Sequence, residues 1–337
     1  MIRLLRINKM LLLFLLITKT ASAQTFHFSQ FHSVPLALNP AMTGNFDENL
    51  RIAANYRSQW VNGGTPYLTG SMGLEFRLMS NELAASNKLG IGLHFLTDKS
   101  NGGGLQYNAV SASLGYCQTL DDDGDQTIGV GFQGTYHQRL INLSKLSFEE
   151  QFTNNGFINA LPTGEAFTTL NKKYLDVNIG LLYKYSSLDT RATYFIGASA
   201  YNILQPNVAL TDKIIYQLPF RFTGHFGGNA PIGEQSSLKF SGTYMQMAKA
   251  SDLTLGMAFD YELVRETGTG ITLGTYYRIG DAAIPYVGLR KNGLQLGFTY
   301  DVTASSIKTL SKTRNAYELS ILFSPFNSTY KNDGNYY

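Results

Sequence analysis

The sequence predicts an all-β protein, a transmembrane antiparallel outer-membrane β-barrel of about 14 strands. Three observations lead to this fold class. The chain begins with an export signal, it has no later apolar run long enough for a membrane-spanning helix, and apolar residues recur with a period of two along most of its length. Low charge with abundant Tyr, Phe and Gly suits strands that turn one face to lipid and the other to a lumen.

The composition excludes several other classes of protein. Of 337 residues, 44% are hydrophobic, 13% aromatic and only 15% charged, which argues against disorder and against a coiled coil. The mean hydropathy of −0.10 argues against a helical membrane protein. Without the four basic residues of 1–23, the chain has 23 basic and 24 acidic residues, so no basic surface for nucleic acid is expected.

Residues 1–23 have the organisation of a secretory signal peptide. Basic residues precede an apolar run from Met10 to Ile17, and Ala21-Ser22-Ala23 forms a small-x-small cleavage site. The run is too short to span a bilayer, and no cysteine is present for lipoprotein processing. We expect the mature chain to begin at Gln24; a retained N-terminal anchor is the alternative.

The remaining chain divides into three expected parts. Residues 24–49 are expected to form a periplasmic segment or a plug, 50–323 the barrel, and 324–337 a periplasmic tail. Alternation is weakest in 190–202, where both faces are mixed, and in 283–290, which is short and contains Pro285. The fourteen candidate strands are 51–60, 67–78, 89–97, 105–120, 127–139, 175–185, 190–202, 220–230, 237–247, 253–262, 271–279, 283–290, 294–301 and 316–323.

The lengths of the connections support a barrel with two different ends. The short, turn-like connections include 121–126, 186–189, 231–236 and 291–293. The long connections 140–174, 203–219 and 302–315 all fall on the opposite side, as the extracellular loops of outer-membrane barrels do. A soluble propeller is the alternative architecture, but it requires a repeat of about 40–50 residues, and the sequence has none.

Two sequence motifs have a structural reading that fits better than a functional one. Gly129, Gly131 and Gly134 match G-x-G-x-x-G, but they lie inside an alternating strand rather than between a strand and a helix. The acidic run 121–125 resembles a calcium loop, yet Gln126 stands where that loop requires glycine. We interpret Gly129 and Gly131 as small residues on the lumen face and the acidic run as a solvated turn.

No catalytic residue, cofactor-binding residue or metal ligand is predicted. The five histidines form no H-E-x-x-H motif, and no G-x-S-x-G sequence occurs. The single cysteine, Cys117, lies on the small, polar face of its strand and is interpreted as a spacer rather than a nucleophile.

The face expected to line the lumen carries charges of both signs, and the sequence leaves open whether the lumen is filled or forms a channel. These residues are Arg51, Arg57, Glu75, Arg77, Asp176, Lys184, Arg221, Lys239, Asp260, Glu262, Arg278 and Arg290. Four phenylalanines on the longest loop are candidate partner contacts, with an inward-folded lid as the alternative. They are Phe148, Phe152, Phe157 and Phe167.

Four short motifs resemble those of a known family. Asn39-Pro40-Ala41 with Gly44 resembles the N-P-A-x-x-G signature of the PorP/SprF family, and Tyr56-Arg57-Ser58-Gln59-Trp60 is similar to its Y-R-x-Q-W. Leu204-Gln205-Pro206-Asn207, after a G-x-S at 197–199, resembles its Q-P-N block. Leu218-Pro219 followed by Arg221 resembles its L-P-x-R. In order and spacing, the resemblance covers nearly the whole mature chain.

The resemblance implies an integral outer-membrane barrel of Bacteroidetes type IX secretion, without catalytic residues. Its expected partners are membrane lipid, other secretion components, a large surface protein with a sorting C-terminal domain such as a gliding adhesin, and a periplasmic peptidoglycan-binding protein. We expect the barrel to serve in export or surface anchoring, holding a partner through 140–174 and 203–219. The alternatives are a solute channel of porin or lipid-uptake type, separated by conductance, and an outer-membrane enzyme, for which no nucleophile and base are found.

Overall fold

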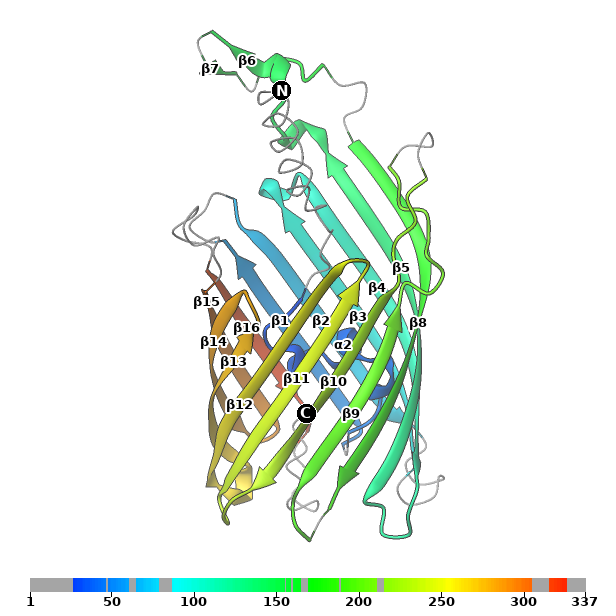
Figure 1. Cartoon of the computed structure of the whole chain (residues 1–337), viewed down its shortest axis with the longest axis vertical. Coiled ribbons are helices and arrows are strands. Elements are labelled where there is room, and N and C mark those ends of the chain that lie inside the picture. The colour runs from blue at the N-terminus through cyan, green and yellow to red at the C-terminus, as the bar shows by residue number, and fades with distance from the viewer. Residues whose placement is uncertain are drawn as a thin grey trace, which may run out of the picture.

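A computed structural model describes residues 27–46, 48–60, 65–78, 87–154, 156–158, 160–164, 169–187, 189–210, 215–304 and 315–325. The expected signal peptide lies outside these residues, as does all of the tail beyond residue 325. Fourteen antiparallel strands form a closed barrel (Figure 1), which confirms the predicted fold class. The strands are β1 (Leu50–Gln59), β2 (Tyr67–Leu78), β3 (Lys88–Ser100), β4 (Leu105–Thr119), β5 (Gln126–Asn142), β8 (Thr169–Ser186), β9 (Thr193–Tyr201), β10 (Arg221–Pro231), β11 (Ser236–Met247), β12 (Ala250–Val264), β13 (Thr269–Arg278), β14 (Ala282–Lys291), β15 (Leu294–Thr303) and β16 (Ala316–Phe323).

Each strand pairs with its neighbours in the sequence, and β1 pairs with β16 to close the barrel. Closure satisfies backbone hydrogen bonds within the wall, which is what a strand needs in order to cross hydrocarbon. The two least regular ranges are also strands, β9 and β14. In β14 the pairing with β15 passes over Ile284 and Pro285, because proline has no N–H to donate.

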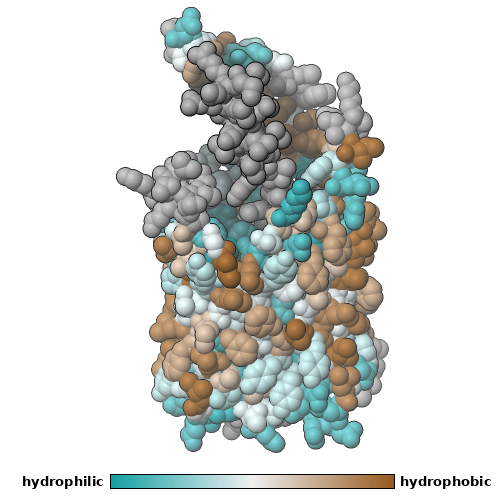
Figure 2. Space-filling model, in the orientation of Figure 1, coloured by the Kyte–Doolittle hydropathy of each residue, from teal (hydrophilic) through white to brown (hydrophobic). Residues whose placement is uncertain are grey.

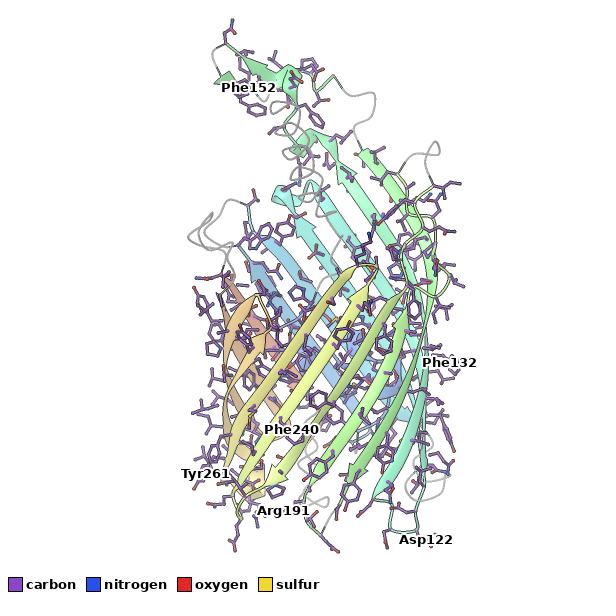
Figure 3. The ribbon with its side chains drawn as sticks, viewed as in Figure 1. Asp122, Phe132, Phe152, Arg191, Phe240 and Tyr261 are labelled. Carbon is purple, nitrogen blue, oxygen red and sulfur yellow. The ribbon has the colours of Figure 1, made fainter. Side chains whose placement is uncertain are left out.

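The strands separate apolar and polar side chains as their period-two pattern predicts. Large apolar residues such as Phe132 and Ile196 are exposed on the outer wall, whereas Arg57 and Glu318 are fully buried inside. Figure 2 shows apolar residues spread over the outer wall, and Figure 3 shows Phe132 directed away from it. The apolar surface therefore faces the position of lipid, and the charges face the lumen.

The wall is taller on one side than on the other. Strands β4, β5 and β8 have 15, 17 and 18 residues, whereas β13 to β16 have 8 to 10. The small hairpin of β6 (Phe152–Thr153) and β7 (Gly156–Phe157), which follows β5, lies above the rim of the barrel (Figure 1). Figure 3 places Phe152 and Asp122 at opposite ends of the molecule, so the longest loop and this short turn lie at different ends, as predicted.

The helices of the described residues are short. Inside the barrel they are η1 (Phe31–Ser33), α2 (Pro35–Leu38) and η2 (Pro40–Met42); elsewhere they are η3 (Asn101–Gly103), η4 (Leu143–Lys145), η5 (Glu149–Gln151) and η6 (Arg265–Thr267). None of the helices in this part of the chain has the length and apolar character needed to cross a membrane.

Candidate functional site

Residues 27–46, which are most of the described part of the expected N-terminal segment, lie inside the lumen; we call them the plug. Proline at the first position starts both α2 and η2, where its missing N–H costs no hydrogen bond. Phe31, Leu38 and Met42 pack against inward-facing side chains of the wall, among them Ile284. The plug is therefore held by a hydrophobic core of its own within a polar lumen.

The first end of the plug is bound by a buried ionic network. The Ser29 and Gln30 amides donate to the Glu318 carboxylate at 2.8 and 2.9 Å, and the Ser29 hydroxyl donates to Asp301. Arg57 forms ion pairs with Asp301 at 2.7 Å and with Glu318 at 3.1 Å. Arg278 pairs with Asp301 at 3.2 Å and also with Asp252 and Asp281, whose side chains are more exposed. The buried part of the network therefore contains two cations, Arg57 and Arg278, and two anions, Asp301 and Glu318. The buried charges are thus balanced, which burial requires.

A second ion pair holds the other end of the plug. Arg51 pairs with Glu75 at 2.8 Å and donates to the Met42 carbonyl at 3.1 Å. The Gly44 amide donates to Glu75 at 3.3 Å. Arg51 and Glu75 lie near the end of β1 and β2 that carries the short turns, whereas Arg57 lies toward the long-loop end. The plug therefore runs along the lumen from the long-loop side to the short-turn side.

Between these ends, the plug backbone rests on a row of glycines. Gly90, Gly115, Gly131 and Gly180 are register partners across β3, β4, β5 and β8. A Cβ atom on Gly131 would lie 2.2 Å from the Pro40 carbonyl carbon, and one on Gly115 would lie 2.3 Å from the Thr43 oxygen. The row therefore admits the backbone of residues 40–44 only because it has no side chains. Gly44, with φ +71°, has a conformation that L side chains rarely adopt.

Asn39 connects the plug to β8 and β10. Its side-chain oxygen accepts from the Ala41 amide at 2.8 Å and caps η2, and its amide nitrogen donates to the Leu181 carbonyl at 2.9 Å. The same nitrogen lies 2.9 Å from Nε2 of His225. The N-P-A-x-x-G sequence thus shapes and docks the plug: Asn39 caps and docks it, Pro40 starts η2, and Ala41 and Gly44 lie where larger groups would meet the wall.

The other motif residues have separate places in the wall. Tyr56 faces outward beside Tyr317, and the Trp60 ring lies edge-on to Tyr67, 4.6 Å between centroids. Gln59 is half-buried at the end of β1. The Arg221 guanidinium stacks 3.9 Å above the Tyr201 ring.

The Q-P-N block shapes the loop between β9 and β10. The Asn207 side chain accepts from the Ala209 and Tyr216 amides at 3.1 and 3.0 Å, and the Leu218 amide donates to the Pro206 carbonyl. Gln205 precedes them with φ +46°, and the Pro219 carbonyl accepts from Asn202 at 2.9 Å. These residues organise a loop rather than meeting the plug.

The candidate contact phenylalanines do not fold into the lumen as far as they are described. Phe152 is 71% exposed and Phe157 43%, and they pair across the β6–β7 hairpin. Phe148 is half-buried before η5, and Phe167 lies outside the described residues. The exposed pair is therefore accessible to a partner at the long-loop end.

Charged side chains that face the lumen form further ion pairs. Lys239 and Arg290 both pair with Asp260, at 3.4 and 2.6 Å. Cys117 is buried, and the described residues contain no group of three or more His, Cys, Asp or Glu side chains that could hold a metal. Burial and the nearby charge of Lys239 lower the pKa of His32, in the plug, to about 4.

Sequence reasoning missed the acidic half of the first network. Asp301 and Glu318 lie on the polar faces of their predicted strands, but only the closed barrel brings them to Arg57. The glycine row was also missed, since its members are separated in sequence and meet only through strand register. A search for inward-facing glycines at matching heights would have indicated it.

Comparison with solved structures gives distant fold similarities. The chain is similar to a FadL homologue of Pseudomonas aeruginosa (9% identity, TM-score 0.49, 85% of this chain and 92% of that one). It is also similar to the toluene transporter TbuX of Ralstonia pickettii (11%, 0.46, 86% and 92%) and to BamA of Haemophilus ducreyi (8%, 0.42, 82% and 71%). Comparison with curated proteins gives no match.

A family model settles the relationship that the motifs indicated. The model for the type IX secretion system membrane protein PorP/SprF matches residues 20–323, most of the chain. The match includes the plug and all fourteen strands, whose apolar outer wall suits a lipid bilayer. The chain is therefore an integral outer-membrane β-barrel and belongs to the PorP/SprF family of type IX secretion system membrane proteins.

Proposed function

We propose that this barrel anchors or helps to export a large cell-surface protein, such as an adhesin with a sorting C-terminal domain, and binds it through its long outer loops. The observation that carries the proposal is the apolar surface of these loops. Phe152 and Phe157 are exposed on one, and Leu204, Ile215 and Tyr216 on the other. Exposed apolar groups on ordered loops are typical of protein contacts. A periplasmic peptidoglycan-binding protein is a second partner compatible with this role.

The plug supports an anchoring role over an open solute channel. Residues 28–46 are almost all buried, and ion pairs and hydrogen bonds hold them at both ends. A freely conducting lumen would require these contacts to break. The plugged barrel instead offers a fixed outer surface, on which the loops of the tall side stand above the rim.

Deletion of residues 146–168 tests the proposal. The tagged protein is recovered in mild detergent from its native outer membrane after crosslinking, and the surface proteins with a sorting domain that remain bound are quantified. We expect the deletion to abolish retention while heat-modifiable gel migration shows an inserted barrel.

A finer comparison uses point variants. Phe152→Ser with Phe157→Ser removes the exposed rings, and Leu120→Ser is the matched control, since Leu120 is 54% exposed near the short turn at 121–125. Only the loop variant should lose the partner. Equal retention by the deletion, the double variant and the control contradicts the proposed function.

A further inference from the structure

Strand β8 changes from an interior strand to an edge strand along its length. Every residue from Thr169 to Tyr185 has a register partner on β5 or β9, but the two neighbours cover different parts. β5 pairs from Thr169 onward, whereas β9 pairs only from Ile179. Among the residues that the structure describes, the upper half of β8, residues 169–178, therefore has a strand on one side only, where the tall wall rises above the low one (Figure 1).

Strand geometry identifies which backbone groups face the open side. The Ile203 amide donates to the Val177 carbonyl at 3.3 Å, so the backbone of Val177 faces away from β5. Because the direction alternates along an antiparallel strand, the N–H and C=O groups of Leu175, Lys173 and Asn171 face the same way. Within the described part of the chain, no backbone hydrogen bond reaches these three residues from that side.

The neighbouring loop packs on the inner face of β8. Beyond Ile203, Val208 and Leu218 form a small buried cluster with Tyr174, whose ring points into the lumen and stacks on His137. Asn207 and Gln217 form a bridge at the base of the same loop. The loop thereby packs against this part of β8 from inside, and Ile215 and Tyr216 on the same loop are exposed.

The charge of the edge selects among extended partners. Between Thr169 and Leu175 the strand carries Lys172 and Lys173 and no acidic residue. Lysines on an exposed edge oppose pairing with a second copy of the same strand, because like charges would meet. A partner strand with a carboxylate opposite these lysines gains from the same charges.

We propose that the upper edge of β8, residues Asn171–Leu175, receives an extended acidic segment of another protein as an added β-strand. Backbone hydrogen bonds to Asn171, Lys173 and Leu175 provide the main interaction, and the lysines provide the charge preference. The inference rests on the proposed anchoring function for its occupant, a segment of the retained surface protein. It assigns to β8 a binding role that is separate from the exposed phenylalanines of β6–β7.

A backbone substitution with a matched side-chain control tests the edge. Asn171→Pro removes an edge N–H, and proline is tolerated where the N–H faces outward. Asn171→Ala keeps the N–H and removes the same side chain. The probe is a fluorescein-labelled octapeptide of alternating valine and glutamate, and its binding to the full-length barrel in detergent is followed by anisotropy. Heat-modifiable migration confirms that each variant is folded.

We expect Asn171→Pro to weaken binding about tenfold or more, because a hydrogen bond is lost and the ring blocks approach, whereas Asn171→Ala stays within about threefold of the parent. Lys173→Glu should also weaken binding of this peptide and should improve binding of a valine–lysine version. Absence of peptide binding to the parent, or equal binding by the proline and alanine variants, overturns the proposal.

The peptide-binding assay tests the β8 edge separately from the proposed anchoring function. The anisotropy assay contains no surface protein, so it reports on the edge alone. If the peptide binds as expected but loop deletion leaves surface-protein retention unchanged, the edge stands as a strand-binding site and the anchoring function fails. If loop deletion abolishes retention but the two Asn171 variants bind the peptide equally, only the inference on β8 fails.

Discussion

Gly131→Ala places a methyl group in the space that the plug backbone occupies. The added carbon would lie 2.2 Å from the Pro40 carbonyl carbon and 2.3 Å from both the Pro40 oxygen and the Ala41 nitrogen. All three are backbone atoms, which cannot move aside by changing a rotamer. The plug segment at η2 must therefore shift away from β5.

The expected cost of this shift is about 1–3 kcal/mol, the range for forcing an extra methyl into a packed site. It corresponds to about a 5- to 150-fold change in the ratio of undocked to docked plug. Buried plug side chains such as Phe31, Leu36 and Leu38 each contribute about 1.5–3 kcal/mol to docking. The substitution should therefore make undocking more frequent without emptying the lumen.

Thiol labelling measures the change directly. Ser33→Cys places a thiol at a plug position that is 2% exposed, in a Cys117→Ser background. When docking is fast compared with labelling, the maleimide rate is proportional to the undocked fraction. Gly134→Ala is the control, since it lies on the same strand and its added Cβ meets no atom within 4 Å. We expect labelling about 5- to 150-fold faster for Gly131→Ala and unchanged for Gly134→Ala. Equal labelling rates would refute the argument that the glycine row seats the plug.

Three further predictions concern the charges and the lumen. Glu318→Ala removes one of the buried ion-pair partners of Arg57 and should lower the free energy of unfolding, measured by urea titration, by about 3–5 kcal/mol. Arg265→Ala, which removes an ion pair exposed at the end of the barrel, should lower it by less than about 1 kcal/mol. The pKa of His32 is about 4 in the docked plug and 6.5 when the side chain is free, so docking is strongest above pH 6.5 and weakens by about 1.4 kcal/mol per pH unit as the pH falls toward 4. The rate of thiol labelling at Ser33→Cys, divided by the rate for an exposed thiol, should rise with this slope. An identical slope in the His32→Gln variant contradicts the prediction. Removal of residues 27–46 should raise single-channel conductance in planar bilayers well above that of the intact barrel, and an unchanged conductance would show that the plug does not block ions.

The wall of this barrel could be predicted closely because its determinants are local. Alternation places Leu175 outside and Asp176 inside whatever the rest of the chain does, since successive side chains leave opposite faces of a strand. The composition of the short turns, such as the acidic turn at 121–125, likewise predicted which end of the barrel lies opposite the long loops. Even β9 and β14 formed where predicted, although their patterns were irregular, because each is flanked by two strands with which its backbone pairs.

The site was less predictable because its members meet only across the barrel. The sequence placed Asn39-Pro40-Ala41 in a segment outside the predicted strands, and it predicted that Gly131 lies on the lumen face. It could not determine that one rests on the other, or that Ser29 meets Glu318 across 289 positions of the chain. Strand register and closure decide these contacts, and both depend on pairing between distant strands. Period-two alternation was therefore enough to predict a barrel wall with two different faces. Strand register and closure were needed to show that residues 27–46 fill the lumen and that, among the described residues, no strand pairs with the upper half of β8 on the side away from β5.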